Sequence, residues 1–381
     1  MSVPKLRFRG FTEEWEKKKL GEITKRVKGN DGRMNLPTLT ISAKNGWMRQ
    51  EDRFSSNIAG AEQKNYTLLS KGELSYNHGN SKLAKYGVVY SLKHINEALV
   101  PKVYHSFKTT KFFYNLFIEY LFMSKIPDRE LRKLISSGAR MDGLLNIGYD
   151  EFMGINVILP EFEEQQKIGD FFMLLDKRIE QQEQKIALLK DYKKAMMQKI
   201  FSQKIRFKDE NGNDYPDWEE KKLGEIVYRN SKKNKDQKYT LIQSISNKYG
   251  FVNQEDYFED RRVGSLDVSN YYVINNGCFA YNPSRIDVGS LAYKNDNDIS
   301  IISPLYVSFK GNAKHINDKF LLGWLFSHKF VGKLGRLFEG SVRNTLSYEN
   351  LSTIDIETPC IAEQEKIALF LEVINDSIEN Q

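Results

Sequence analysis

Few residues in this sequence could support catalysis or bind a metal ion. Five histidines share no spacing typical of zinc ligands, and none recurs at the same place in both halves of the chain: His78, His94, His105, His315 and His328. The two cysteines, Cys278 and Cys360, form no CxxC pair, which argues against a zinc site and a disulfide framework. We therefore expect solvated or core histidines, buried thiols and no metal site.

Three short stretches come close to motifs of enzymes without completing them. "GRLFEGS" (335–341) has the glycine spacing of a phosphate loop but lacks its lysine. "YNPS" (281–284) lacks the second proline and the stacking aromatic of an amino-methyltransferase loop, so a turn is favoured. "PDWEEK" (216–221) crowds into six residues the carboxylates and lysine that a nuclease takes from separate strands. The sequence offers no catalytic residues, and we predict a protein that is not an enzyme.

Composition and charge bound the remaining possibilities. The chain has 381 residues, of which 40% are hydrophobic and 12% aromatic, enough for two globular domains. It has no run of about 18 apolar residues and no apolar signal segment after its basic N-terminus, so we expect no membrane span. Two cysteines suit a reducing cytoplasm. The net charge of +7 is compatible with a polyanionic partner such as nucleic acid.

The segments that must position any binding residues occur twice in the sequence. "WEKKKLGEI" (15–23) returns as "WEEKKLGEI" (218–226), an offset of 203 residues. Further matches follow in the same order at offsets of 204, 205, 202 and 199: 46–54 with 250–258, 65–77 with 270–282, 104–108 with 306–310, and 164–172 with 363–371. A constant order with a small drift indicates a duplicated module of about 200 residues.

Each copy begins with a globular part and continues into a helix. Residues 86–92 and 155–160 read as strands, whereas 111–124 and 319–334 read as buried helices. This mixture predicts a strand-rich α+β domain in each copy. The predicted domains are residues 1–160 and 205–358, with a central helix over 161–204 and the start of a second helix over 359–381.

The helical parts carry a heptad seam. In the first copy its apolar positions are Ile168, Phe172, Leu175, Ile179, Ile186, Leu189, Met196 and Ile200. In the second copy they are Ile367, Leu371, Ile374 and Ile378. Gln182 and Lys193 interrupt the seam, either fixing its register or marking where another helix joins. We expect the two helices to form an antiparallel coiled coil with approximate two-fold symmetry, the first being a rod of roughly 60 Å.

Several segments together resemble one protein family. The domain starts "PKLRFRGFTEEWEKKKLGEI" and "IRFKDENGNDYPDWEEKKLGEI", the helix "LPEFEEQQKIGDFFMLLDKRIEQQ", and the stretches "YNPSRIDVGS" and "EGSVRNTLSYENLSTIDIETP" are similar to the specificity subunit of bacterial type I restriction–modification enzymes. The resemblance covers nearly the whole chain. It implies two target-recognition domains, each reading one half of a split DNA sequence, held apart by helices that act as a spacer.

The resemblance also implies partners and cofactors. Two modification subunits would bind S-adenosylmethionine and methylate adenine, and restriction subunits would use ATP and Mg²⁺; the specificity subunit itself needs no cofactor. DNA recognition requires cations for phosphates and polar side chains for base edges. Candidates in turn-rich segments are Asn77, Lys82, Lys85 and Arg140 in the first copy and Asn282, Arg285, Lys294 and Arg343 in the second.

Two questions stay open at the level of sequence. The same duplicated plan could serve a protein-interaction scaffold that binds no DNA. The second helix is expected to stop about half-way along its rod, leaving roughly Leu189 to Ile200 without a partner inside the chain. A second copy of the chain or a modification subunit is then expected to cover that part of the seam.

Overall fold

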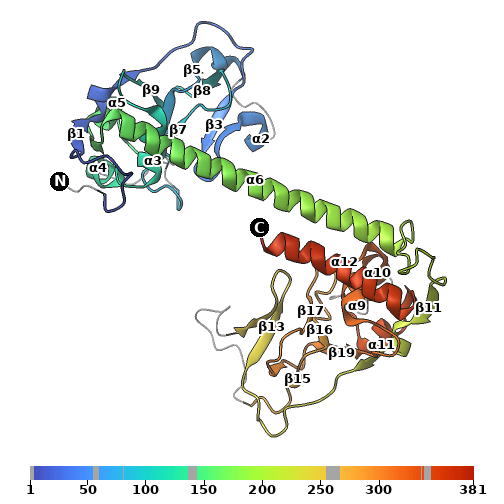
Figure 1. The fold of residues 1–381 in the computed structure, drawn as a ribbon. Coiled ribbons are helices and arrows are strands. Elements are labelled where there is room, and N and C mark those ends of the chain that lie inside the picture. Colours follow the sequence, from blue (N-terminus) through green and yellow to red (C-terminus); the bar gives the residue numbers. More distant parts are fainter. Residues whose placement is uncertain are drawn as a thin grey trace. The chain divides into compact units, whose positions relative to one another are not determined.

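The computed structural model (Figure 1) describes residues 4–54, 60–79, 81–135, 144–254, 267–335, 337–338 and 345–381. The chain divides into two compact units, residues 1–181 and 182–381, called here the first and the second unit. The division falls inside the long helix α6 (Phe162–Phe201), whose two parts belong to different units.

The first unit contains one four-stranded antiparallel sheet and three two-stranded sheets. The sheet has the order β2-β9-β6-β7, with bounds Thr24–Arg26, His105–Thr109, Leu74–Asn77 and Val88–Ser91. Two-stranded pairs are β1 (Glu16–Lys19) with β10 (Asn156–Leu159), β3 (Leu39–Ser42) with β4 (Gly46–Arg49), and β5 (Thr67–Ser70) with β8 (Glu97–Val100). The helices are α1 (Leu20–Ile23), α2 (Gln50–Phe54), the 3-10 helix η1 (Gly60–Asn65), α3 (Asn115–Met123), α4 (Asp128–Leu134) and α5 (Tyr149–Met153).

The second unit repeats this plan. Its four-stranded sheet has the order β12-β19-β16-β17, with bounds Val227–Arg229, Val307–Gly311, Cys278–Tyr281 and Leu291–Tyr293. A second sheet has the order β14-β13-β18-β15, with bounds Gly250–Asn253, Ile242–Ser246, Ser300–Ile302 and Tyr272–Ile274, and β11 (Glu219–Lys222) pairs with β20 (Asp355–Thr358). The helices are α7 (Leu223–Ile226), α9 (Asp318–Leu325), α10 (His328–Leu334), α11 (Tyr348–Ser352) and α12 (Ile361–Glu379). The predicted α+β class is confirmed in both units.

The repeated opening phrase anchors each unit to its core, as its apolar residues predict. Trp15 packs edge-on against Phe117 with ring centroids 5.9 Å apart, and Trp218 packs against Phe320 in the same way at 6.0 Å. The leucines that follow are buried: Leu20 and Leu223. The lysines between them lie on short strands that pair with β10 and β20, so the phrase is structural.

A second repeated anchor ties the start of each long helix to the chain N-terminal to it. Arg7 donates to both carboxylate oxygens of Glu164 at 2.8 and 2.7 Å, and Arg206 donates to those of Glu363 at 3.3 and 2.8 Å. Both glutamates are fully buried. Trp218 adds an indole N–H to Glu363 at 3.3 Å. Because such buried charges are stable only when paired, each helix start has one defined position on its unit.

The helix predicted over 319–334 is two helices. α9 ends at Leu325 and α10 begins at His328, with Ser327 in an extended conformation between them. The Ser327 hydroxyl donates to the carbonyl of Trp324 at 2.6 Å, and its N–H also bonds there at 2.9 Å. These local bonds close the last turn of α9, which the density of apolar residues alone could not indicate.

The end of α6 packs against α12 within the second unit. Residues 182–201 and α12 run in opposite directions (Figure 1): Phe201 at the end of α6 shares one core cluster with Ile367 in the first half of α12, and Glu379 at the end of α12 attracts Lys193. Ile200 and Phe201 are fully buried. The expectation that Leu189 to Ile200 lack a partner inside the chain is therefore wrong, because antiparallel pairing sets the start of α12 beside the end of α6.

The remaining seam residues lie in different surroundings. Within the second unit Ile186, Leu189, Met196 and Ile378 are half-buried, and Ile367 and Ile374 are buried. Within the first unit Ile168 packs against the core, but Phe172, Leu175 and Ile179 are 43%, 42% and 57% exposed. Of the helices in the described part of the chain, none is long and apolar enough to cross a membrane.

Candidate nucleic-acid interface

In the first unit, the loop after β6 is held against the segment that leads into α5. The N–H of Leu145 donates to the carbonyl of His78 at 2.8 Å, and Gly79 forms a β-bridge with Leu144. Two chain segments nearly 70 residues apart therefore meet at one end of the four-stranded sheet. We call the described residues of 78–87 and 144–149 the loop edge of the first unit.

The second unit has an equivalent loop edge, formed by residues 282–290 and 345–348. Leu346 donates its N–H to the carbonyl of Pro283 at 3.1 Å and accepts a hydrogen bond from the Tyr281 hydroxyl at 3.1 Å. The loop is internally braced, because the Asn282 N–H donates to Ser290 and the Asn282 side chain accepts from the N–H of Ser284, both at 3.0 Å. A braced loop holds its exposed side chains with little loss of conformational freedom on binding.

Most of the predicted DNA-binding residues that the structure describes lie on these two edges. Lys82 and Lys85 are exposed on the first, and Arg285 is exposed on the second. Asn77 ends β6 but is half-buried, and its amide donates to the carbonyl of Ile41 at 3.1 Å, which leaves it little capacity for a base. Asn282 is similarly engaged within its own loop. Arg140 and Arg343 lie outside the described residues.

Lys294 is a wrong candidate. Its side chain is only 1% exposed, and its ammonium donates to Gln243 Oε1 at 3.1 Å and pairs with Asp296 at 2.7 Å. Lys294 directly follows β17 and is buried beside Gln243 of β13, a strand of the second sheet. A buried cation that is already bound to two partners cannot reach a phosphate without breaking those bonds.

The structure adds an arginine to each loop edge that sequence reasoning missed. Arg26 at the end of β2 lies over the ring of Tyr149, 4.0 Å from its centroid, and Arg229 at the end of β12 lies over Tyr348 at 5.6 Å. Arg229 also pairs with Glu349 at 2.9 Å. A signal existed in the sequence, since each arginine stands three residues after the isoleucine of the repeated phrase.

Stacking on tyrosine orients these arginines without consuming all their donors. A guanidinium has five N–H groups, and a cation–π contact uses its face rather than its edge. The edge of Arg26 therefore stays available to an anion. Burial raises the pKa of Tyr149 above its ordinary value, so the ring stays neutral and keeps its electron-rich face.

Two histidines join the loop edge of the first unit to its core. The ring nitrogens of His78 lie 2.7 Å from the carbonyl of Leu145 and 3.0 Å from that of Val103. His105 stacks on His78 at 5.0 Å and hydrogen-bonds to Ile147 at 2.8 Å. Burial lowers the pKa of His105 below its ordinary value, which favours a neutral ring. Both act as core residues, as expected, and hold the segment before Tyr149 in place.

A basic hollow of about 310 Å³ lies next to Arg229 in the second unit. Its other cations are Lys232 and Lys310, and Tyr228 and Tyr239 contribute aromatic walls. Among the described residues that line it there is no carboxylate. Lys310 faces Tyr228 directly across the β12–β19 pair. Such a concave cluster of cations and aromatics has the chemistry that binds phosphate oxygens.

No metal centre emerges in the part of the chain that the structure describes. There, His, Cys, Asp and Glu side chains form no group of three or more able to hold an ion. Cys278 is buried, with its pKa raised by burial, and Cys360 is half-buried; both are free thiols.

Comparisons with known proteins agree with this picture. Residues 215–381 match the model of the type I restriction modification DNA specificity domain. A curated protein of Methanocaldococcus jannaschii, assigned as the specificity subunit of the type I restriction enzyme MjaX, is 25% identical over 256 residues. That match covers 61% of this chain and 56% of the relative, so the chain spans about half the length of the curated relative it matches.

The fold is shared with a solved structure. The crystal structure of a type I restriction-modification system S subunit from M. genitalium superposes with a TM-score of 0.60, covering 100% of this chain and 94% of that one at 14% identity. Residues 1–181 repeat the plan of the matched domain strand by strand. Residues 215–381 therefore contain a DNA specificity domain of the type I restriction–modification family, and the chain as a whole is similar to a specificity subunit of that family.

Proposed function

We propose that this chain is the DNA-recognition subunit of a type I restriction–modification complex. Each unit reads one half of a bipartite DNA target through its loop edge, and the helices α6 and α12 set the spacing between the half-sites. The observation that carries the proposal is the repetition of one cationic arrangement, Arg26 over Tyr149 and Arg229 over Tyr348, at the same end of two equivalent sheets.

The chain supplies recognition and assembly rather than chemistry. It binds two modification subunits, which bring S-adenosylmethionine and methylate adenine, and it recruits restriction subunits that use ATP and Mg²⁺. The complex acts in the cytoplasm, where its DNA substrate and reduced thiols occur together. Lysines and arginines at the loop edges contact phosphates, and polar side chains beside them contact base edges.

Salt-dependent DNA binding by the complex assembled with its modification subunits tests this proposal. Arg229→Ala should weaken binding to all sequences about equally and reduce the slope of log affinity against log salt by about one. Lys314→Ala is a matched control, since Lys314 is exposed after the other end of β19, away from residues 282–290. Equal effects of the two variants would refute the assignment of the loop edge.

A different measurement separates DNA recognition from the alternative of a protein scaffold. Mapping of methylated adenines in DNA exposed to the complex should reveal a bipartite motif with a constant gap. Replacement of residues 1–160 by those of a relative should change one half of that motif only. A scaffold that does not read DNA would leave the motif unchanged after the replacement.

A further inference from the structure

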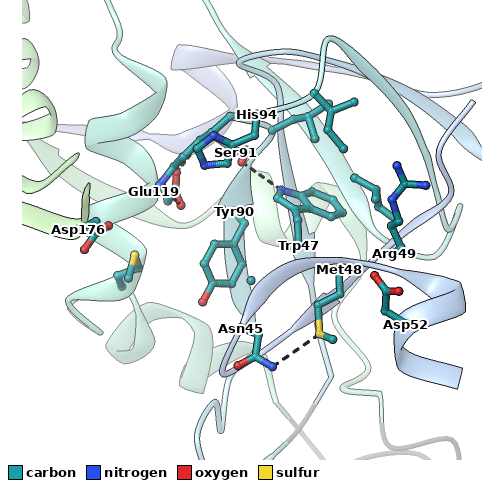
Figure 2. A pocket seen from close by; sticks show the side chains of 16 residues that line it. Asn45, Trp47, Met48, Arg49, Asp52, Tyr90, Ser91, His94, Glu119 and Asp176 are labelled. Carbon is teal, nitrogen blue, oxygen red and sulfur yellow. Dashed lines mark hydrogen bonds and ion pairs between the residues drawn. The ribbon is translucent and has the colours of Figure 1, made fainter. Parts of the chain in front are cut away.

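A hollow of about 480 Å³ in the first unit has no role in the proposed DNA contacts (Figure 2). It lies between the β3–β4 hairpin, the end of β7, helix α3 and the part of α6 that belongs to this unit. Its walls are aromatic and thioether side chains, and its polar groups include three carboxylates. Its lining includes the aromatic residues Trp47 and Tyr90 and the carboxylates of Glu119, Asp176 and Asp52.

The aromatic walls are held in position. The indole N–H of Trp47 donates to the carbonyl of Ser91 at 3.0 Å, a bond drawn in Figure 2. The ring of Tyr90 packs against Gly46, where a Cβ would lie 3.4 Å from a ring carbon. Gly46 also has a φ of +65°, a backbone conformation that favours glycine. Both the backbone and the nearby ring therefore disfavour a larger residue at position 46. Two aromatic side chains therefore line a preformed hollow.

Three carboxylates line the hollow, against two permanently charged cations, Lys93 and Arg49. Glu119 is 1% exposed and accepts hydrogen bonds from the Ser91 hydroxyl at 2.5 Å and from Lys93, whose ammonium lies 3.0 Å away. Arg49 at the rim pairs with Glu51 outside the hollow at 3.2 Å. Asp176 accepts a hydrogen bond from the Tyr120 hydroxyl at 2.7 Å.

Uncompensated negative charge thus remains at the mouth. Neither Asp176 nor Asp52 has an ion pair within the described ranges of the chain. Burial raises the pKa of Glu119 even though Lys93 lowers it, so this carboxylate would gain from a second cation. The same charge repels phosphate, which sets the hollow apart from a DNA contact.

The second unit lacks this arrangement. By the matched positions of the two copies, Leu322 stands for Glu119, Ala292 for Tyr90 and Asn375 for Asp176. Three functional groups are therefore missing together. Structural features shared by both units serve both, whereas an acidic aromatic hollow in one unit serves something that binds once per chain.

We propose that the hollow binds the guanidinium group of an arginine side chain from a protein partner. A planar guanidinium stacks on Trp47 or Tyr90 through its face and donates through its edge to the exposed Asp176, and the buried carboxylate of Glu119 adds to the attraction. Phosphates have the wrong charge, and an apolar group would leave the carboxylates unpaired. The inference goes beyond DNA recognition and does not rest on it.

An NMR titration of the full chain with N-acetyl-arginine amide tests the site directly. The indole N–H resonance of Trp47, identified by its loss in Trp47→Phe, should shift on addition of the probe. N-acetyl-citrulline amide has nearly the same shape without the charge, and it should bind roughly tenfold more weakly. Equal shifts with both probes, or none with either, would overturn the proposal.

Two matched variants exclude a general effect on the fold. Asp176→Asn keeps an acceptor for Tyr120 but removes the charge, and it should weaken binding of the arginine probe by roughly fivefold to tenfold. Asp170→Asn is the control on the same helix. Asp170 also accepts a tyrosine hydroxyl, that of Tyr114 at 2.7 Å, but it lies outside the hollow. Asp170→Asn should leave binding unchanged, and an equal loss in both variants would contradict the assignment.

A parallel titration with spermidine distinguishes a guanidinium of a partner protein from a free polyamine. Spermidine carries several ammonium groups but no planar fork. Weaker binding of spermidine than of the arginine probe supports a guanidinium from a partner protein. Tighter binding of spermidine would overturn that assignment and make the hollow a site for a free polyamine.

Discussion

The packing of α12 on the second unit depends on Leu371, and its truncation is the most direct test of the fold. Leu371 is 5% exposed, and its Cδ1 lies so close to Gly323 of α9 that a Cβ there would be only 2.7 Å away. Phe201 at the end of α6 faces the same glycine, with its ring 3.5 Å from that position. Leu371 therefore joins three helices, and Leu371→Ala should weaken all their contacts.

The magnitude follows from the atoms removed. Leucine loses three carbons on truncation to alanine, and about 0.8 kcal/mol for each buried carbon group comes to about 2.4 kcal/mol. A rigid surrounding of helix backbone and aromatic ring cannot close the cavity fully, so we expect a total loss of about 3 kcal/mol. Leu369→Ala is the matched control, because Leu369 lies on the same helix but is 62% exposed.

Urea unfolding of the full chain, followed by hydrogen–deuterium exchange of peptides from α12, measures both effects locally. Leu371→Ala should lower the free energy of unfolding of the second unit and reduce the protection of α12, and Leu369→Ala should change either by less than about 0.5 kcal/mol. If the two variants cost the same, α12 does not pack on the end of α6 as described.

Three further predictions concern buried charges. Burial lowers the pKa of Lys193 within the seam, so Lys193→Leu should raise the stability of the second unit by about 1 kcal/mol in urea unfolding. Glu363→Gln should lower it by about 3 kcal/mol, because Arg206 loses its buried partner. The pKa of His105 is lowered in the folded state, so the unfolded state binds more protons just below pH 6.5, and the first unit should lose stability as pH falls there.

Each of these has a result that would contradict it. A less stable Lys193→Leu variant would mean that attraction by Glu379 outweighs the cost of burial. For Glu363→Gln the control is Glu365→Gln, because Glu365 is exposed. An equal loss of stability in the two variants would mean that the buried Arg206–Glu363 pair contributes nothing specific. A pH dependence unchanged in His105→Leu would assign the acid sensitivity to other groups.

Much of the architecture could be predicted from local patterns. The duplication, the two domain starts and the long helix all followed from residue order, because repeated phrases and heptad spacing are properties of contiguous sequence. The strands at 86–92 and 155–160 are β7 and β10. The break between α9 and α10 escaped prediction, because it depends on one serine whose hydroxyl closes a helix turn.

The candidate site was predictable only in part. Sequence patterns located turn-rich segments with cations, and in the structure Lys82, Lys85 and Arg285 are exposed on the loop edges. They could not distinguish such residues from Lys294, whose surroundings come from Gln243 and Asp296 after folding. Residue type states what a side chain can bind, and burial decides whether it is free to do so.

By itself, then, the sequence determined that this protein is two copies of one module joined by helices and that it carries no catalytic motif. Only the tertiary structure decided which groups meet. Arg26 and Tyr149 are 123 residues apart, and Trp47 and Asp176 are 129 apart, yet each pair shares a site. The physical reason is that sheet pairing and helix packing bring together segments whose contacts leave no local pattern in the chain.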